Sequence, residues 1–175
     1  MDAGAAYVGL PGGRLVALSL ETGALRWEAA VAMPRGSNEI ERIADVVGTP
    51  LISGREICAA TFQGRVGCFD LATGSNRWAR DLSSEVGVAV DQRFVFAPDD
   101  KGALYAYNRD GGVSAWKNDK LSYRRLSTPV SYGRTVAVGD YKGFIHFLSR
   151  EDGAFLARAA TDGSESFNVL KRVLG

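Results

Sequence analysis

The chain has few of the histidine and cysteine residues on which many enzyme and metal sites depend. Its 175 residues include one histidine, His146, and two cysteines, Cys58 and Cys68. These are too few for a zinc site built from cysteine and histidine, or for a framework of several disulfides. A lone histidine with no serine, cysteine or carboxylate pair near it in sequence is more typical of a structural residue. We therefore predict no catalytic residue, no metal site and no cofactor.

An excess of one charge and a long apolar run are also absent. Lysine and arginine number 21 against 20 acidic residues, so the formal net charge is +1. Proteins that grip the phosphates of nucleic acid usually carry a basic excess, and a membrane-spanning helix needs roughly 20 apolar residues. The first residues also lack the cationic and apolar segments of a secretion signal. We expect no nucleic acid partner and no membrane span in this chain.

Glycine is abundant, and many glycines belong to an internal repeat. The chain has 21 glycines and an aromatic content of 10 %, which is typical of short strands joined by tight turns. Four segments share a template in which a glycine is followed ten residues later by a second glycine, and in three of them tryptophan follows four residues further on; in the fourth, alanine replaces it. The first glycines are 51, 38 and 41 residues apart. The template positions are Gly13, Gly23 and Trp27; Gly64, Gly74 and Trp78; Gly102, Gly112 and Trp116; and Gly143, Gly153 and Ala157.

Each copy of the repeat is predicted to form a small antiparallel sheet. In the second copy, residues 56–62 and 65–71 are rich in strand formers and flank a predicted two-residue turn, Gln63-Gly64. A third strand over 76–81 and a segment after Pro50 complete four strands in about 40 residues. That period predicts an all-β fold, a β-propeller of four-stranded blades with about four blades present. The recurring indoles of Trp27, Trp78 and Trp116 are predicted to dock one blade against the next.

The repeat divides the chain into blades of one propeller segment, residues 1–175. The first blade lacks an opening strand, because that strand would fall before residue 1. Two alternatives remain, a partial ring of a longer propeller and a closed ring of four blades in which the tail supplies the missing strand. The expected parts are blade 1 at about 5–32, an insertion loop at 33–48, blade 2 at about 49–84, blade 3 at about 85–122, blade 4 at about 126–161 and a tail at 162–175.

Several motifs resemble known families of propellers. Residues 17–27, ALSLETGALRW, and residues 68–78, CFDLATGSNRW, are similar to the tryptophan-docking repeat of quinoprotein-like propellers. Residues 36–46, GSNEIERIADV, followed by Thr49-Pro50, resemble the BamB outer-membrane assembly lipoproteins, a more specific match. The segments DGGVSAW at 110–116 and VGDYKGFIH at 138–146 resemble the same family. Val47 stands where that family often carries a second aspartate.

The resemblance implies a fold, a function and a location. BamB-like propellers have eight blades, so a partial ring of an eight-bladed parent is favoured over a closed ring of four. The family implies a non-catalytic scaffold that binds the periplasmic domains of the barrel assembly protein at the periplasmic face of the outer membrane. Membrane association would come only from a lipid anchor of the parent, which this chain does not contain.

The candidate partner-binding residues lie in the insertion and in one turn. Glu39, Arg42 and Asp45 are three residues apart, so they could share one face of a helical turn, with Ile40 and Ile43 on a neighbouring face. The residue types fit either a partner contact or a loop held down by its own charges, and the resemblance favours the contact. The turn aspartates Asp99 and Asp100 are a weaker candidate for the same face.

Two other functions and one structural question remain open. The chain could be part of a quinone-dependent dehydrogenase, whose relatives share the tryptophan repeat, or a generic protein-interaction propeller of the cytosol. No adjacent pair of cysteines, which several such dehydrogenases use, is present. The two-residue turn at Gln63-Gly64 would set Cys58 across from Phe69 and point Cys68 to the other face, so free buried thiols are expected unless a bulge changes the register.

Overall fold

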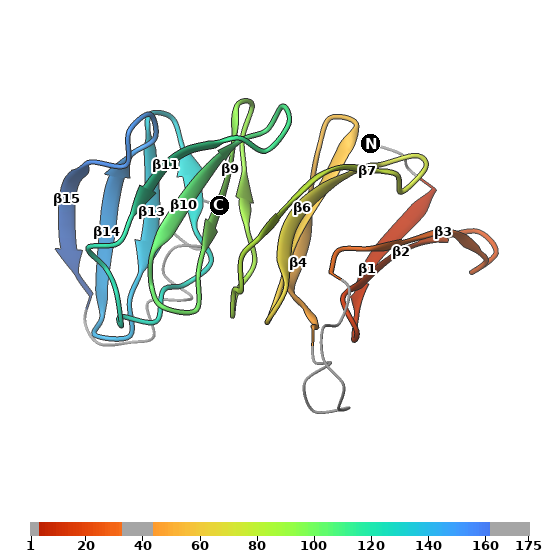
Figure 1. The fold of residues 1–175 in the computed structure, drawn as a ribbon, viewed down its shortest axis with the longest axis horizontal. Coiled ribbons are helices and arrows are strands. Elements are labelled where there is room, and N and C mark those ends of the chain that lie inside the picture. The colour runs from red at the N-terminus through yellow and green to blue at the C-terminus, as the bar shows by residue number, and fades with distance from the viewer. Residues whose placement is uncertain (1–3, 33–43, 162–175) are drawn as a thin grey trace. The chain divides into compact units, whose positions relative to one another are not determined.

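The structure is a computed structural model that describes residues 4–32 and 44–161 (Figure 1). The described residues form only antiparallel sheets, and among them there is no helix long and apolar enough to cross a membrane. The predicted all-β fold of repeated propeller sheets is confirmed. The first sheet has three strands in the described part of the chain, and each of the other three sheets has four.

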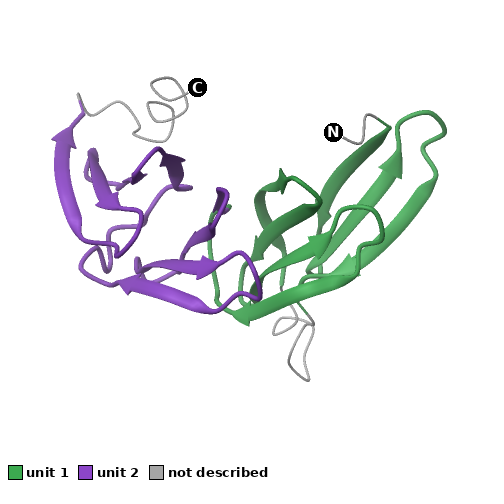
Figure 2. Ribbon diagram, turned by 90° about the horizontal axis from the view of Figure 1, so that it is seen from above, with its two compact units in different colours: residues 1–87 green, residues 88–175 purple. Residues whose placement is uncertain are grey.

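Residues 1–87 form one compact unit that holds the first two sheets (Figure 2). In each sheet the strands follow one another in sequence order. The first sheet comprises β1 (Ala5–Leu10), β2 (Arg14–Ser19) and β3 (Leu25–Ala30), and the second comprises β4 (Val46–Ser53), β5 (Glu56–Thr61), β6 (Arg65–Asp70) and β7 (Asn76–Asp81).

Residues 88–175 form a second compact unit with the third and fourth sheets (Figure 2). Both of its sheets are antiparallel and again follow sequence order. The third sheet comprises β8 (Ala89–Val90), β9 (Phe94–Pro98), β10 (Leu104–Asn108) and β11 (Ser114–Asn118), and the fourth comprises β12 (Val130–Tyr132), β13 (Thr135–Gly139), β14 (Phe144–Ser149) and β15 (Phe155–Ala160).

The first unit has a hydrophobic core between its two sheets. Trp27 of β3 packs with Leu15 and Ala17 of β2 and with Ile57 and Phe69 of the second sheet. The indole N–H of this tryptophan donates a hydrogen bond of 3.1 Å to the carbonyl of Leu71. One large aromatic ring thus joins two sheets by burial and by a hydrogen bond to the backbone.

The second unit repeats this arrangement. Trp116 of β11 packs with Phe96 and Leu104 of its own sheet and with Val138 and Leu148 of the fourth sheet. Its indole N–H donates a hydrogen bond of 2.9 Å to the carbonyl of Arg150. Each of these two indoles therefore lies between its own sheet and the next sheet along the chain.

At Gly74 and Gly153, the second glycine of the template lies directly against the indole of the preceding copy. A Cβ atom added at Gly74 would lie 2.5 Å from Cε3 of Trp27, and one added at Gly153 would lie 2.5 Å from Cε3 of Trp116. Both glycines also have positive φ, 72° and 71°. No other residue has room for this contact, which explains why glycine and tryptophan recur together in the template.

A β-bulge recurs at the same template position in all four sheets. The register of the paired strands skips the residue just before the tryptophan position, which is Arg26, Arg77, Ala115 or Leu156. Residues two apart normally share one face of a strand, but the extra residue puts the residues on either side of it on opposite faces. The bulge therefore sets which side chains of each outer strand face the neighbouring sheet.

Candidate functional site

The base of the insertion is fixed on the first sheet. A Cβ atom added at Gly13 would lie 2.7 Å from the carbonyl oxygen of Ala32 and 2.8 Å from that of Ala44, so the two residues that flank 33–43 pack against this turn. Asp45 accepts a hydrogen bond of 2.9 Å from the N–H of Gly12 through its Oδ1. These contacts connect the insertion directly to the turn between β1 and β2.

Asp45 is the predicted partner-binding residue of the insertion that the structure describes. It is half-buried, and its carbonyl accepts a hydrogen bond of 2.9 Å from the N–H of Phe62. Its side chain thus reaches the first sheet while its backbone is bound to the second. The other predicted members of the group, Glu39, Ile40, Arg42 and Ile43, lie outside the described residues, so their grouping with Asp45 stays a prediction.

The turn that carries Asp99 and Asp100 joins β9 to β10. Oδ1 of Asp99 accepts hydrogen bonds from the backbone N–H groups of Lys101, at 3.0 Å, and Ala103, at 2.7 Å. This carboxylate closes its own turn, whereas the side chain of Asp100 is exposed. Of the two aspartates, Asp100 is therefore the one whose side chain is more accessible to a partner.

The turns at the first template glycine are tied to the strand that ends the same sheet. The carbonyl of Gly13 accepts a hydrogen bond from Val31, that of Gly64 from Leu82 and that of Gly143 from Thr161, at 2.8, 3.1 and 2.8 Å. Buried or tied backbone groups restrict the motion of a turn. The insertion therefore extends from a well-anchored part of its sheet. In the turn of Asp99, the carbonyl of Lys101 accepts a hydrogen bond of 2.7 Å from the N–H of Tyr123.

His146 lies in the fourth sheet within a buried polar network. Its Nε2 is 2.9 Å from Oδ2 of Asp140, and the same oxygen accepts a hydrogen bond of 2.8 Å from Nη1 of Arg124. Asp140 also accepts hydrogen bonds from the backbone N–H groups of Lys142 and Phe144. His146 and Asp140 are both almost fully buried.

The surroundings of Asp140 keep it ionised. Burial raises the pKa of this carboxyl group, but hydrogen bonds from His146, Arg124 and the N–H of Phe144 outweigh burial, and the net shift is downward. Since every polar atom named here has a partner, the network is suited to holding the turn between β13 and β14. The VGDYKGFIH motif of the sequence therefore encodes a buried network that includes Arg124, which the motif itself does not contain.

A second ionic network joins the third and fourth sheets within unit 2. Asp91 accepts hydrogen bonds from the side chains of Ser131 and Arg150 and from the backbone of Phe94. Burial raises the pKa of Asp91, but these hydrogen bonds and one from the N–H of Arg93 give a net lowering. No sequence pattern predicted this network, because Ser131 and Arg150 lie 40 and 59 residues after Asp91 in the chain.

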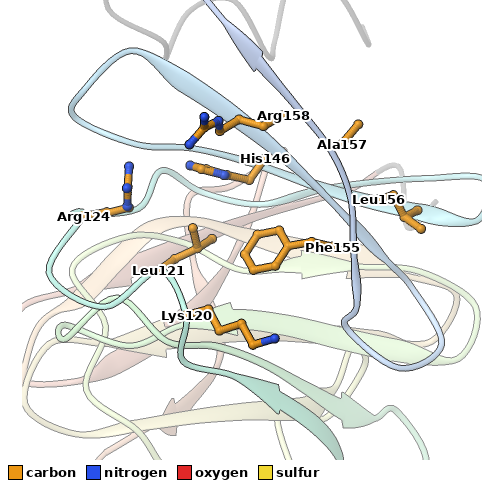
Figure 3. Close-up of a pocket in the computed structure, with 8 residues that line it drawn as sticks. All are labelled: Lys120, Leu121, Arg124, His146, Phe155, Leu156, Ala157 and Arg158. Carbon is orange, nitrogen blue, oxygen red and sulfur yellow. The ribbon is translucent and has the colours of Figure 1, made fainter.

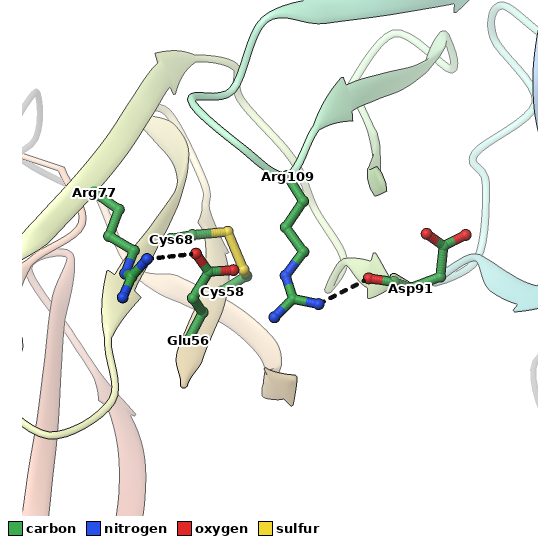
Figure 4. Close-up of a disulfide and its surroundings, with 6 residues drawn as sticks. All are labelled: Glu56, Cys58, Cys68, Arg77, Asp91 and Arg109. Atoms are coloured by element: carbon green, nitrogen blue, oxygen red, sulfur yellow. Dashed lines mark hydrogen bonds and ion pairs between the residues drawn. A yellow bond between two sulfur atoms is a disulfide. The ribbon is translucent and has the colours of Figure 1, made fainter. Parts of the chain in front are cut away.

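The cysteines form a disulfide, so the prediction of free thiols is wrong. Cys58 of β5 and Cys68 of β6 lie directly opposite each other, and both are fully buried (Figure 4). Strands β5 and β6 are joined by three residues, 62–64, and not by the expected two. Gln63 takes a φ of 52° in this loop. The extra loop residue moves the register by one and brings the two sulfur atoms together.

The second sheet also has ion pairs between its strands. Figure 4 shows Arg77 of β7, whose Nη1 donates to Oε1 of Glu56 at 3.1 Å. Its Nη2 donates to Oδ2 of Asp70 at 3.1 Å. Within residues 4–32 and 44–161, no group of three or more histidine, cysteine or acidic side chains is placed to hold a metal ion.

Comparisons with known proteins agree on one family. Residues 1–118 match the model of the family described as outer membrane protein assembly factor BamB. The chain is 50 % identical to the BamB of Burkholderia pseudomallei over 91 % of this chain and 42 % of that protein. It resembles the crystal structure of BamB from Moraxella catarrhalis with a TM-score of 0.86 and 35 % identity, over 92 % of this chain and 48 % of that one.

A dehydrogenase shares the fold alone. A quinohemoprotein alcohol dehydrogenase from Pseudomonas putida HK5 aligns with a TM-score of 0.68 at 14 % identity, over 90 % of this chain and 33 % of that chain. The chain spans less than half the length of the curated relatives reported above.

Proposed function

Because the chain belongs to the family of the outer membrane protein assembly factor BamB, we propose that it is a scaffold in the assembly of outer membrane proteins. It holds a partner protein and performs no chemistry. The observation that supports this most directly is the anchoring of the residues that flank 33–43: Ala32 and Ala44 pack on Gly13, and Asp45 binds the N–H of Gly12. Because these residues are held in place, binding a partner does not have to order them.

The partner we propose is the periplasmic part of the barrel assembly protein. Glu39, Ile40, Arg42, Ile43 and Asp45 of the insertion make the main contact. Apolar anchors lose water on binding, and an arginine supplies a forked donor that is always charged. In the other unit, Asp99 shapes a turn on which the exposed Asp100 offers a second contact.

The proposed location is the periplasmic face of the outer membrane. Disulfides form and persist mainly in oxidising compartments such as the bacterial periplasm, and rarely in the cytosol. The buried Cys58–Cys68 bond therefore favours this location over that of a cytosolic propeller. The lipid anchor of a longer parent would supply the attachment to the membrane.

The proposal of a non-catalytic role also has support from individual side chains. The chain's one histidine, His146, is 2 % exposed and bound to Asp140. A general base must reach the proton that it abstracts, and this imidazole is almost fully buried with its Nε2 bound to Asp140. The competing dehydrogenase function rests on a likeness of fold at 14 % identity. Adding the quinone and calcium would separate the two functions, because dye-linked oxidation of alcohols is expected only of a dehydrogenase.

The test of the scaffold function is a binding measurement on single variants. Arg42→Ala is expected to weaken binding to the purified periplasmic domains of the barrel assembly protein at least tenfold, in the range of an interface anchor. The control is Arg55→Ala, which removes an exposed arginine from the turn between β4 and β5. Surface plasmon resonance gives the affinities, and thermal unfolding shows whether each variant is folded.

Two results would contradict the proposed contact. Equal affinity of wild type and Arg42→Ala for the barrel assembly protein would show that Arg42 of the insertion is not part of the interface. A large fall in the melting temperature of Arg42→Ala would instead show that the arginine holds the loop in place.

A further inference from the structure

The second unit contains a pocket that the proposed scaffold function does not use (Figure 3). It has a volume of about 350 Å³, within the range of about 300 to 1,000 Å³ typical of ligand sites. Residues of the connection between β11 and β12 form one side, and residues of β14 and β15 form the other. The pocket lies entirely within residues 120–158, so it depends on this unit alone.

Positive charge is concentrated around the pocket. Lys120, Arg124 and Arg158 line it (Figure 3). Arg124 is already paired with the buried Asp140 at 2.8 Å. Lys120 and Arg158 have no ion pair with a carboxylate in the part of the chain that the structure describes, although the guanidinium of Arg158 also lies 4.7 Å from the centre of the Phe144 ring. Two cations are therefore left for an anionic ligand in a chain whose net charge is only +1.

The remaining wall of the pocket is apolar. Leu121 is buried, whereas Phe155 and Leu156 are 40 % and 58 % exposed. Leu156 is the bulged residue of β15, so Phe155 and Ala157 face opposite sides of the strand. The ring of Phe155 projects from β15 toward Leu121 and His146 (Figure 3), and its centre is 6.0 Å from that of the His146 ring. Exposed apolar side chains beside uncompensated cations favour a ligand that has both characters.

We propose that this pocket binds an acidic peptide segment in which a carboxylate side chain stands next to an aromatic or aliphatic residue. The carboxylate pairs with Arg158, and the apolar side chain packs on Phe155 and Leu121. Lys120, at the other end of the pocket (Figure 3), adds attraction for the acidic segment. The apolar side chains beside these cations favour a peptide over inorganic phosphate, because a peptide supplies an apolar group as well as a negative charge. The proposal is independent of the insertion and of the proposed scaffold contact.

His146 provides a direct reporter of the pocket. It is the chain's one histidine, so its ring signals in an NMR spectrum need no assignment. It also lines the pocket. The probe is the blocked peptide acetyl-Ala-Glu-Phe-Ala-amide, titrated into the 175-residue chain. We expect a saturable shift of the His146 ring signals, and none with a peptide in which lysine replaces the glutamate. Because an ion pair is involved, raising the salt concentration should weaken the binding.

Variants separate a specific site from general attraction. The double variant Lys120→Gln/Arg158→Gln is expected to bind the peptide at least tenfold more weakly, and Phe155→Ala about fivefold more weakly. Arg158→Lys keeps the charge and should retain most of the binding. The matched control, Lys101→Gln/Lys142→Gln, removes two exposed cations of the same unit that do not line the pocket and should bind within twofold of wild type.

Four outcomes would overturn the proposal. The first is the absence of any shift at millimolar peptide, and the second is an equal loss of binding in the control variant. The third is equal competition by inorganic phosphate, which would make the pocket a general anion site. The fourth is binding to vesicles that contain an anionic phospholipid without binding to the peptide, which would assign the pocket to a membrane surface. None of these results depends on the barrel assembly protein.

Discussion

Single residues of this chain have roles that depend on the neighbouring copy of the repeat. Gly23 and Gly74 occupy the same template position and have nearly the same φ, 70° and 72°. A Cβ atom at Gly23 would meet nothing within 4 Å, whereas one at Gly74 would meet the indole of Trp27. Replacing Gly23 by alanine therefore adds backbone strain alone, whereas replacing Gly74 adds the same strain and also a clash with the indole of Trp27.

We predict that Gly74→Ala destabilises the chain more than Gly23→Ala does. Both variants place a Cβ in the left-handed region, which costs roughly 1–2 kcal/mol. Gly74→Ala also forces the indole of Trp27 to move, for which overpacking costs about 1–3 kcal/mol more. Urea unfolding followed by circular dichroism measures both free energies. Equal losses would show that the indole shifts without cost.

A second prediction concerns Asp140. Its pKa is lowered in the folded chain, so this group contributes stability that is fully present above its ordinary pKa of 3.8 and is lost as the pH falls through the lower folded value. At neutral pH, Asp140→Asn should cost roughly 3 kcal/mol, because Arg124 and His146 lose a buried charged partner.

The test for Asp140 is a series of unfolding curves at several pH values. The difference in stability between wild type and Asp140→Asn should shrink as the pH falls below about 4, since protonation removes the same charge from the wild type. Asp100→Asn, at an exposed position, is the control and should change stability by less than about 0.5 kcal/mol. A difference that stays constant with pH would contradict the role assigned to the Asp140 charge.

At the scale of elements, the disulfide joins two neighbouring strands, β5 and β6. The bond closes a loop with a sequence separation of 10, and a loop of this size contributes about 2–3 kcal/mol in the chain-entropy model. We predict that Cys58→Ala/Cys68→Ala lowers the free energy of unfolding by this amount. Guanidinium unfolding of the oxidised wild type and of the variant measures it.

Reactivity gives an independent check of the same bond. Both cysteines are fully buried, so the native chain should resist reductants until it opens locally. A thiol reagent added in denaturant should find no free thiol before reduction and two after it. Two free thiols in the unreduced chain would restore the original expectation from sequence.

The sheets and their order could be predicted from the sequence because glycine and tryptophan recur at fixed spacing. Register could not, since it depends on the length of each turn. The loop at 62–64 needs Gln63 in the left-handed region, and turn preferences alone assign that conformation to glycine. One residue of error was enough to separate Cys58 from Cys68. The bulges at Arg26, Arg77, Ala115 and Leu156 also have no residue type in common that would predict them.

The candidate site was predictable only in part, for a similar reason. The spacing of charged residues marked the insertion, and the structure describes Asp45 of this group with its bond to Gly12. The pocket beside His146 was not foreseen, because Lys120 and Arg158 come from segments 38 residues apart. Side chains brought together by tertiary packing leave no local pattern in a single sequence.

At the scale of the whole molecule, each compact unit has a core of its own. The cluster around Trp27 draws on residues of the first unit, and the cluster around Trp116 draws on the second. We predict that Trp116→Phe increases amide hydrogen exchange mainly within residues 88–161, and that Trp27→Phe does so mainly within residues 4–32 and 44–87. Exchange followed by mass spectrometry measures this. An equal increase everywhere would show that the two units unfold together.

The pairing of an indole in one copy with a glycine in the next has a consequence for how such chains evolve. Trp27 and Gly74 form one functional pair although they belong to different copies, as do Trp116 and Gly153. A duplication or exchange of DNA whose boundaries fall between copies preserves these pairs only if the incoming copy brings a glycine for the old tryptophan and an aromatic ring for the old glycine. The tryptophan of one copy and the glycine of the next therefore have to change together for the contact between their sheets to be kept.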